Sequence, residues 1–317
     1  MQRILFPRDF KETADGKMRM SGDHVKVRDY FEHALAHPDL APYLYFTPRS
    51  AYETSDVWDG LPPERIVREL DVAAYDLFFV TGKEWKLLPR DIEGSGIIQY
   101  VQSIRQCEPE HRLFRFFKRG AHRICSSDEV AAMTAPLVKG DIAVIPNGIP
   151  LDIFRSIGER RQPRSVVIWG RKSPEMAEGL RRALVKRGFA VDLLIAFLPR
   201  LEFAARLARS DIAITLPART EGFFLPALEA MACGAVVVCA DAIGNRGFCV
   251  EGETCLMPPR GNIAAHAAAV ERIVEDSGFA ERLRTRGLAM AQQFSLDRER
   301  AAFHRFVDER ILASIPA

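Results

Sequence analysis

The sequence predicts an α/β protein with two Rossmann-like domains, each built on a parallel β-sheet. Short β-rich runs alternate with helix-length segments along the chain, most of these runs are continuously apolar, and the 317 residues suit two domains of roughly 100–200 residues. Continuous Val, Ile, Leu and Phe runs are typical of strands buried on both faces of a parallel sheet. We expect the two sheets to face each other across a cleft, because open α/β sheets bind ligands at the carboxyl ends of their strands.

The amino-terminal half contains six predicted strands. They are residues 3–7, 43–47, 76–81, 97–102, 122–126 and 141–145. A long polar loop, 8–22, follows the first strand and leads into a predicted helix from His24 to Ala36. The half therefore begins with a β–α unit whose loop lies at the carboxyl end of a strand.

The carboxyl-terminal half repeats this alternation. Strands are predicted over 165–169, 190–196, 211–216 and 235–240, and helices over 174–187, 201–209 and 226–233. The tail 281–314 is helical in pattern, since its apolar residues recur at helical spacing. These apolar residues are Phe303, Phe306, Val307 and Ile311.

The two halves meet at a segment that is typical of a turn. Residues 145–154 read Ile-Pro-Asn-Gly-Ile-Pro-Leu-Asp-Ile-Phe, and both the prolines and the Asn-Gly pair favour turns. Residues 155–164 are polar and contain no predicted strand. We therefore expect an amino-terminal domain over 1–147, a linker over 148–164 and a second domain over 165–295.

Composition excludes several classes of protein. Apolar residues make up 48% and charged residues 27%, and 44 Lys and Arg nearly balance 42 Asp and Glu, for a net charge of +2. This balance argues against a nucleic-acid partner bound through bulk positive charge. No apolar run reaches the about 20 residues that span a bilayer, and the first residues lack the apolar stretch of a secretory signal.

The six cysteines give no metal-ligating pattern. None forms a Cys-x-x-Cys pair, and no histidine pair stands nearby at ligand spacing. We therefore expect no metal site, and we expect reduced, half-buried thiols in a cytoplasmic protein.

The segment 217–234 carries the most informative site residues. After strand 211–216, a loop with Glu221 and Gly222 leads into a helix near Pro226, which suits the first helical turn. A helix start preceded by glycine offers backbone N–H groups to a phosphate. Glu229 lies about one turn into this helix. Two carboxylates would repel a bound anion unless they faced other groups, and sugar hydroxyls are suitable partners because they donate hydrogen bonds.

Glu221 and Glu229, eight positions apart around Gly-Phe-Phe-Leu-Pro-Ala-Leu, resemble the paired-glutamate motif of retaining glycosyltransferases of family 4, which have the GT-B fold. Three further segments are similar to that family in the same order. They are 145–154, Trp169-Gly170-Arg171 and Phe294-Ser295-Leu296-Asp297. The resemblance covers roughly 120–300 well and 1–120 only loosely. It implies that helix 296–317 crosses back to the amino-terminal domain.

The resemblance implies transfer of a sugar from a nucleotide diphosphate sugar to a glycan or lipid-linked glycan, with retention and without a metal or cofactor. It implies that Glu229 binds the ribose hydroxyls and Glu221 the hydroxyls of the transferred sugar. Arg171 would neutralise the leaving diphosphate. The diphosphate would contact the loop at Gly222 and the backbone N–H groups that come next. These N–H groups belong to Phe223, Phe224 and Leu225.

The sequence departs from the family pattern beside Arg171. The family usually has a lysine five or six positions later, where this chain has Met176 and Ala177. Lys172 is the candidate substitute. The loop 241–248 also lacks the common Pro-Glu pair, and Cys255 replaces a common glycine.

Other functional classes remain open at this point. One alternative is a non-catalytic homologue that binds a nucleotide or a partner enzyme, motivated by the missing lysine. Another is an epimerase or phosphorylase on a similar fold, although no motif for a pyridoxal-phosphate lysine is recognisable.

Two weaker signals lie in the amino-terminal half. Gly22, with Ser21, matches the family's glycine-containing loop that approaches the donor phosphates, although an ordinary β–α loop explains it equally. The stretch 112–123, RLFRFFKRGAHR, contains five basic residues and no acid. As an amphipathic helix it would suit peripheral contact with an anionic membrane at its inner face, and the alternative is a helix packed on the sheet.

Overall fold

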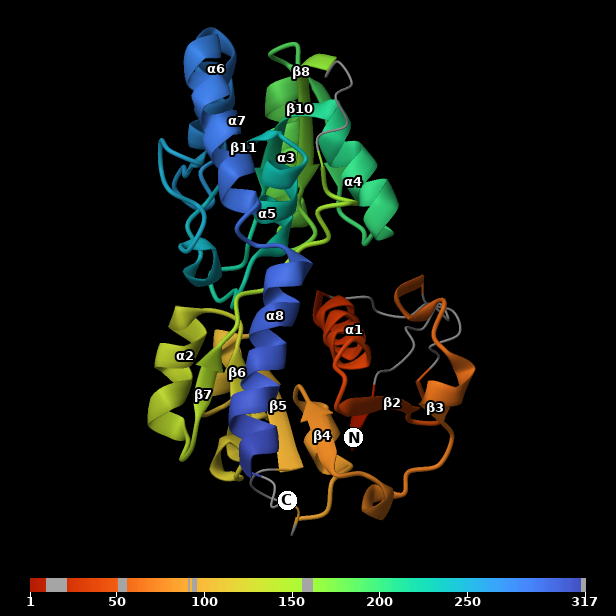
Figure 1. Ribbon diagram of the computed structural model, residues 1–317. Helices are drawn as coiled ribbons and strands as arrows, with labels where there is room; N and C mark the ends of the chain where they lie inside the picture. Colours follow the sequence, from red (N-terminus) through yellow and green to blue (C-terminus); the bar gives the residue numbers. More distant parts are fainter. Residues whose placement is uncertain (10–21, 51–55, 91, 93–95, 156–161, 315–317) are drawn as a thin grey trace. The chain divides into compact units, whose positions relative to one another are not determined.

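The computed structural model describes residues 1–9, 22–50, 56–90, 92, 96–155 and 162–314 (Figure 1). The chain divides into two compact units. Unit 1 contains Met1–Pro146 and Glu299–Ala317, and unit 2 contains Asn147–Arg298. Each unit has its own sheet with parallel strand pairing, which confirms the predicted α/β class with two Rossmann-like domains.

The sheet of unit 1 has the strand order β3-β2-β1-β4-β5-β6-β7. Its strands are β1 (Gln2–Arg8), β2 (Leu40–Phe46), β3 (Ile66–Val67), β4 (Leu77–Val80), β5 (Ile97–Val101), β6 (His122–Cys125) and β7 (Ile142–Val144). The central strands β4 and β5 are buried at every position, as their continuous apolar sequences predict. The strand order reverses between β1 and β4, so the connections that leave the carboxyl ends of these two strands run in opposite directions along the sheet.

The two faces of this sheet are covered differently. On one face, α1 (Gly22–Leu35) and α8 (Leu296–Phe306) pack aromatic and aliphatic side chains against β1, β4 and β5 (Figure 1). On the other face, short 3₁₀ turns cover the sheet, with Trp85 and Phe116 stacked at 5.8 Å. The shorter helix α2 (Asp128–Thr134) begins at Ser127, whose hydroxyl accepts the Val130 N–H.

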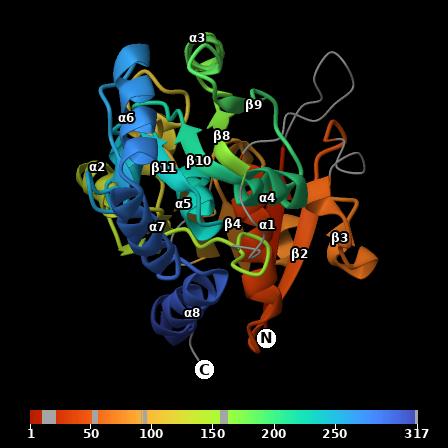
Figure 2. The same ribbon diagram turned by 90° about the horizontal axis from the view of Figure 1, so that it is seen from above.

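The sheet of unit 2 has the order β12-β11-β10-β8-β9. Its strands are β8 (Gln162–Trp169), β9 (Ala190–Leu194), β10 (Ser210–Thr215), β11 (Val236–Cys239) and β12 (Cys255–Leu256). Its helices are α3 (Pro174–Val185), α4 (Arg200–Arg209), α5 (Leu225–Ala232), α6 (Ile263–Glu275) and α7 (Ser277–Ala291). The helices α4 and α5 cover one face, and α3 and α6 cover the other (Figure 2).

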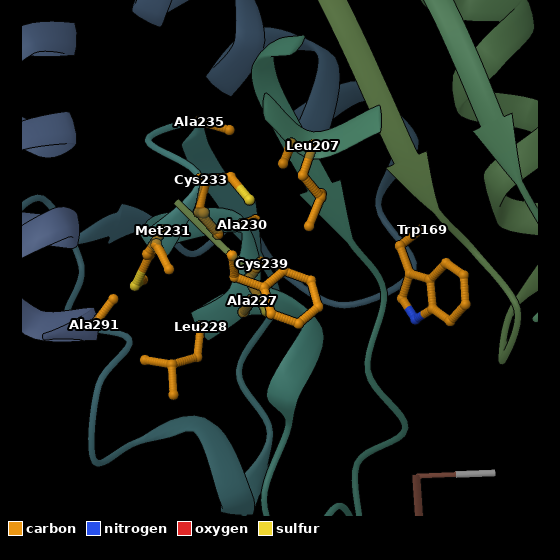
Figure 3. Close-up of a cluster of buried hydrophobic side chains, with 14 of the residues drawn as sticks. Trp169, Leu207, Ala227, Leu228, Ala230, Met231, Cys233, Ala235, Cys239 and Ala291 are labelled. Carbon is orange, nitrogen blue, oxygen red and sulfur yellow. The ribbon is translucent and has the colours of Figure 1, made fainter. Parts of the chain in front are cut away.

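Small side chains allow α5 to lie close to the sheet. Ala227 and Ala230 are fully buried near Cys239, with Leu207 and Trp169 to one side of the cluster (Figure 3). The helix ends at Gly234, whose φ of 76° is one that glycine adopts without strain. This ending matches the helix stop predicted from the sequence, and it returns the chain directly into β11.

Each of the ten predicted strands is present, and the pattern missed β3 and β12, which have two residues each. The tail forms α7, then α8, and then a short π-helix over Val307–Ile311. Phe303 and Ile311 are fully buried in unit 1, as their helical spacing predicts. Gln162 already belongs to β8, so the strand begins earlier than the predicted 165.

The interpretation of 112–123 as an amphipathic helix is wrong. The segment forms a 3₁₀ helix over Phe114–Lys118 and then enters β6 at His122. Two of its five basic side chains turn inward. Arg119 donates to the carbonyls of Pro89 and Ile92, and its guanidinium lies 4.7 Å from the centre of the Trp85 ring.

Arg123 is the second inward-turning cation, and no part of it is exposed. Its guanidinium donates to Gln99 and to the carbonyls of Ala121 and Phe117. Burial lowers the pKa of Arg123 to about 10. These backbone contacts assign Arg119 and Arg123 to the internal structure of unit 1, and membrane contact by the segment stays a prediction.

The two segments at the borders of unit 2 lie side by side. Ile149 N–H donates to the Phe294 carbonyl at 2.8 Å, and Leu296 N–H donates to the Ile149 carbonyl at 3.1 Å. A side chain at Gly148 would place its Cβ 2.5 Å from the Ser295 carbonyl oxygen. Only glycine allows this approach, which accounts for the Asn-Gly pair that the sequence carries there.

All six cysteines are buried and free. Within the described ranges, no helix has the length and apolar character that a membrane span requires. The described residues also contain no group of three or more His, Cys, Asp or Glu side chains arranged to hold a metal ion.

Candidate functional site

The predicted site residues of unit 2 follow the strands at the point where the sheet order reverses. From β8 the chain moves outward to β9 and then returns to β10 on the other side of β8. Open α/β sheets bind ligands at the carboxyl ends of strands at such a reversal. The loop 170–173 follows β8, and the loop 216–224 follows β10.

The first of these loops is a tight turn. Ser173 N–H donates to the Gly170 carbonyl at 2.9 Å, and Pro174 then begins α3. A Cβ at Gly170 would lie 2.1 Å from the Cβ of Ala177, so the turn lies directly against α3. Of the two positions where the family usually has a lysine, Ala177 is fully buried and Met176 is half-buried.

Arg171 and Lys172 project from this turn. The Arg171 side chain is half-buried, and its guanidinium lies 6.0 Å from the centre of the Phe197 ring, which follows β9. Lys172 extends to the next loop, where its Nζ lies 2.5 Å from Glu221 Oε1. The structure therefore brings together the loops after β8, β9 and β10.

Glu221 is held by two donors. Its Oε1 accepts the Ala218 N–H at 3.0 Å in addition to Lys172 Nζ. The Glu221 side chain is 12% exposed and the Lys172 side chain 40% exposed. The pair is therefore open to solvent on the lysine side and largely enclosed on the carboxylate side.

The start of α5 corrects one expectation. Phe224 N–H donates to the Gly244 carbonyl at 3.0 Å, so this N–H is engaged within the protein and does not serve the diphosphate. The Phe224 side chain is also buried in the core. Phe223 and Leu225 remain as predicted N–H donors at the beginning of the helix.

Phe223 connects the site to the carboxyl-terminal motif of unit 2. Its ring lies 5.2 Å from the ring of Phe248 and 5.8 Å from that of Phe294. Phe248 and Phe294 also contact each other at 5.8 Å. The Phe-Ser-Leu-Asp segment at 294–297 therefore supports the loop that carries Gly222 and Phe223.

Glu229 lies in the second turn of α5 and is 8% exposed. Its backbone carbonyl accepts the Cys233 N–H at 3.0 Å, as the helix requires. Gly22 belongs to unit 1, where it is the first residue of α1 rather than part of the preceding loop, and it is exposed. Ser21 lies outside the described residues, and the role of Gly22 stays a prediction.

Sequence reasoning missed three residues that shape the site. A Cβ at Gly244 would lie 2.3 Å from the carbonyl carbon of Gly222 and 2.5 Å from the Phe223 nitrogen. The fully buried side chain of Asn245 accepts the Ala242 N–H and donates to the Ala240 carbonyl. The close approach of Gly244 holds the loop after β11 against the loop after β10, and Asn245 fixes the loop after β11 internally.

Arg260 is the third residue that the sequence did not reveal. Its guanidinium donates to the Pro217 carbonyl at 2.5 Å and also to the Asp241 carbonyl. It thus connects the first residues of the two loops. The Gly-Asn pair at 244–245 was a usable turn signal, whereas nothing in the sequence around Arg260 indicates its partners.

The rim of these loops is basic. Arg246 donates to both carboxylate oxygens of Asp241, at 2.9 and 2.8 Å. This hydrogen bonding, with the nearby charges of Arg260 and Arg219, lowers the pKa of the Asp241 carboxyl. The resulting surface favours a bound anion, as does the amino terminus of α5.

Comparison with known proteins agrees with this site. Residues 149–276 match the family model of the Glycosyl transferases group 1. O-antigen chain mannosyltransferase B of Escherichia coli is 37% identical over 98 residues, which are 31% of this chain and 24% of that protein. D-inositol 3-phosphate glycosyltransferase of Jonesia denitrificans is 30% identical over 142 residues, which are 44% of this chain. The aligned part spans 33% of the latter protein, so the chain spans about a third or less of these curated relatives.

Solved structures match the chain over most of its length. Sucrose-phosphate synthase from Thermosynechococcus elongatus has a TM-score of 0.72 at 16% identity, covering 99% of this chain and 100% of that one. HepE of Anabaena, in complex with UDP-glucose, has a TM-score of 0.72 at 14% identity, covering 97% and 100%. These likenesses show the GT-B fold. The segment 149–276, which contains Glu221 and Glu229, is similar to the group 1 glycosyltransferases.

Proposed function

We propose that the protein transfers a sugar from a nucleoside diphosphate sugar, bound by unit 2, to a glycan or lipid-linked glycan. The observation that carries this proposal is the convergence at one sheet reversal of Arg171, the Lys172–Glu221 pair and the start of α5. The UDP-glucose in the complex of the similar HepE structure supports a nucleotide-sugar donor.

Arg171 is proposed to stabilise the departing diphosphate. Cleavage of the sugar–phosphate bond concentrates negative charge on the leaving group, and a fixed donor aimed at that charge lowers the barrier. A guanidinium is permanently charged and binds phosphate oxygens in a forked geometry. The N–H groups of Phe223 and Leu225 add the partial positive charge of the α5 amino terminus.

The two glutamates are proposed to bind hydroxyl groups. Glu229 accepts the ribose hydroxyls, and Glu221 accepts hydroxyls of the transferred sugar through the oxygen that Lys172 and Ala218 leave available. We assign no side-chain general base, and the leaving diphosphate takes the acceptor proton. The reaction retains the anomeric configuration and needs no metal or cofactor, as the family resemblance implies.

The first experiment is a calorimetric screen of UDP, GDP, dTDP and ADP in the presence of EDTA. We expect one nucleotide to bind with a dissociation constant on the order of micromolar. Arg171→Ala should weaken that binding about tenfold or more, because charge-assisted hydrogen bonds to phosphate are lost. Arg209→Ala is the matched control, since Arg209 ends α4 at the opposite, amino-terminal edge of β10.

Turnover is tested with the glucose conjugate of the nucleotide that binds. Slow hydrolysis of the donor, followed by proton NMR, reports which anomer of glucose appears first. Release of the α-anomer from an α-linked donor supports retention, and first release of the β-anomer contradicts it. Loss of turnover with EDTA would contradict metal independence.

The alternative function is a non-catalytic homologue that binds a nucleotide or a partner enzyme. The missing lysine favours it, because neither Met176 nor Ala177 gives a cation to the diphosphate. Failure of a folded protein to bind any of the four nucleotides would support this alternative over the transferase. Binding without turnover would support it as well.

A further inference from the structure

We propose that Lys172 is a positioning residue that acts through Glu221, and that it fixes this carboxylate for the transferred sugar rather than clamping the diphosphate. The proposal rests on the proposed function of unit 2 as the donor site. It assigns to Lys172 a different role from the missing lysine of the family pattern.

The backbone of Lys172 is set by its neighbours. The turn that carries it is closed by the hydrogen bond from Ser173 N–H to the Gly170 carbonyl at 2.9 Å. Close packing of Gly170 against Ala177 fixes this turn on α3, because any displacement toward the helix meets the Ala177 side chain. Lys172 therefore projects from a rigid point between β8 and α3, and only its side chain has freedom.

The side chain uses that freedom to reach Glu221. Lys172 Nζ lies 2.5 Å from Glu221 Oε1, and a hydrogen bond between these two opposite charges is charge-assisted. The same oxygen accepts the Ala218 N–H at 3.0 Å, so two donors from two loops fix one carboxylate oxygen. A carboxylate has a second oxygen with its own lone pairs, and this oxygen is left to accept hydroxyl groups.

Without Lys172, the Ala218 N–H would be the remaining donor to Glu221 among the described residues. One hydrogen bond allows the carboxylate to move about its side-chain torsions, whereas two donors on different loops fix the position of Oε1 and so restrict the side chain. The pair is partly exposed, and such pairs contribute little to folding stability. Substitution of Lys172 is therefore expected to leave the fold intact and to change the placement of Glu221.

The two possible roles of Lys172 predict different effects on two kinds of ligand. A lysine that clamps phosphate affects a nucleoside diphosphate and its sugar conjugate to the same extent, because both contain the diphosphate. A lysine that places Glu221 affects mainly the conjugate, because only the conjugate contains the transferred sugar. The ratio of the two affinities therefore reports the role of Lys172 and is unchanged by a general loss of folded protein.

The test measures dissociation constants of UDP and UDP-glucose by calorimetry, or of the corresponding pair if the screen selects another base. For Lys172→Met we expect UDP-glucose to weaken about tenfold more than UDP, the loss typical of a hydrogen bond to a charged group. Lys172→Arg should recover most of the difference, since a guanidinium also donates to a carboxylate. In the Glu221→Gln background, Lys172→Met should have no further effect on the ratio.

Lys186→Met is the matched control, because Lys186 follows the other end of α3 and the same charge is removed. Equal weakening of UDP and UDP-glucose by Lys172→Met would overturn the proposal in favour of a phosphate clamp. No change in either affinity would overturn it too, as would a full effect that persists in Glu221→Gln. If the wild-type protein binds no nucleotide, the proposed function itself fails. This outcome is distinct from failure of the role of Lys172, which is judged from the variants of a wild-type protein that binds.

Discussion

The two units place an ion pair at the same point of their sheets, but they bury it to different degrees. In unit 1 the sheet order reverses between β1 and β4, and Arg8 at the end of β1 lies 3.3 Å from Glu84, in the turn after β4. In unit 2 the order reverses between β8 and β10, and Lys172 lies 2.5 Å from Glu221. In both pairs the cation follows the first strand and the acid follows the strand across the reversal.

The acids are also held alike. Glu84 accepts the N–H of Gly82 at 2.9 Å, and Glu221 accepts the N–H of Ala218 at 3.0 Å. The two ion pairs differ in how far their side chains are exposed to solvent. The side chains of Arg8 and Glu84 are 2% and 5% exposed, whereas those of Lys172 and Glu221 are 40% and 12% exposed.

This difference indicates what each pair can do. Arg8 also donates to Thr81 and lies 3.2 Å from the His24 ring nitrogen, so it belongs to a buried polar network of unit 1. Such a network stabilises a fold when its groups are satisfied, and it offers little surface to a ligand. The pair of unit 2 remains within reach of solvent. Topology therefore determines where a site can form, and burial decides whether the residues there serve structure or binding.

The largest loss of unfolding free energy is expected from breaking the buried Arg8–Glu84 pair. Glu84→Ala removes the carboxylate that faces Arg8, and loss of one partner of a buried ion pair costs about 3–5 kcal/mol of unfolding free energy. Glu221→Ala should cost less than about 1 kcal/mol, because its pair is partly exposed. Urea denaturation measures both values. Equal losses in the two variants would contradict the distinction between a structural and an accessible pair.

The next effect concerns the loop that supports the site of unit 2. Gly244→Ala places a Cβ 2.3 Å from the Gly222 carbonyl carbon, so the loop after β10 must move. We expect a loss of about 1–3 kcal/mol in stability from overpacking, with weaker nucleotide binding measured by calorimetry. Gly247→Ala is the control in the same loop, because its Cβ would meet no atom within 4 Å. Undiminished binding in Gly244→Ala would contradict the role of this contact.

A smaller effect is expected from Arg260→Ala. This variant removes the guanidinium that connects the carbonyls of Pro217 and Asp241, and a hydrogen bond to a charged group typically makes a net contribution of about 1.5–3 kcal/mol. Because Arg260 is exposed, we expect a stability loss of about 1 kcal/mol and a moderate rise in the donor KM. Arg246→Ala, which removes a contact with an exposed carboxylate, should change KM less. A fall in kcat at constant KM would contradict a role in holding the loops.

Much of the fold follows from the sequence because the central strands are continuous apolar runs. The strands β3 and β12 escape the pattern, since two residues show no periodicity and their pairing depends on β2 and β11. The helix prediction for 112–123 is wrong for a different reason. A helical projection places its cations on one surface, whereas Arg119 and Arg123 bind internal carbonyls that no local pattern can reveal.

Some features of the candidate site were likewise predictable from the sequence and others were not. Glu221, Glu229 and Arg171 are conspicuous in the sequence because they stand beside glycine, proline and strand ends. The engagement of Phe224 N–H by Gly244 was not predictable, because the two residues come from loops after different strands. The pairing of Lys172 with Glu221 also joins residues 49 positions apart, and only the adjacency of β8 and β10 brings them together.

The smallest expected effect is a pH dependence at the rim of each sheet. Hydrogen bonds from Arg49 lower the pKa of Asp9 in unit 1, and those from Arg246 lower the pKa of Asp241 in unit 2, both from 3.8. A carboxyl whose pKa is lower in the folded state contributes stability above its unfolded pKa and loses it as pH falls through the folded pKa. The contribution of both acids should therefore be full at neutral pH and decline below about pH 3.8.

Asp9→Asn and Asp241→Asn separate the two contributions, because each variant removes one titrating group. Unfolding free energies measured between pH 7 and pH 2.5 should converge with those of the wild type at the acidic end. Asp9 is 8% exposed, whereas Asp241 is exposed, so Asp9→Asn should change the pH dependence more. A larger change in this pH dependence for Asp241→Asn would contradict the contrast between an enclosed unit 1 and an accessible unit 2. It would also assign a structural role to the rim of unit 2.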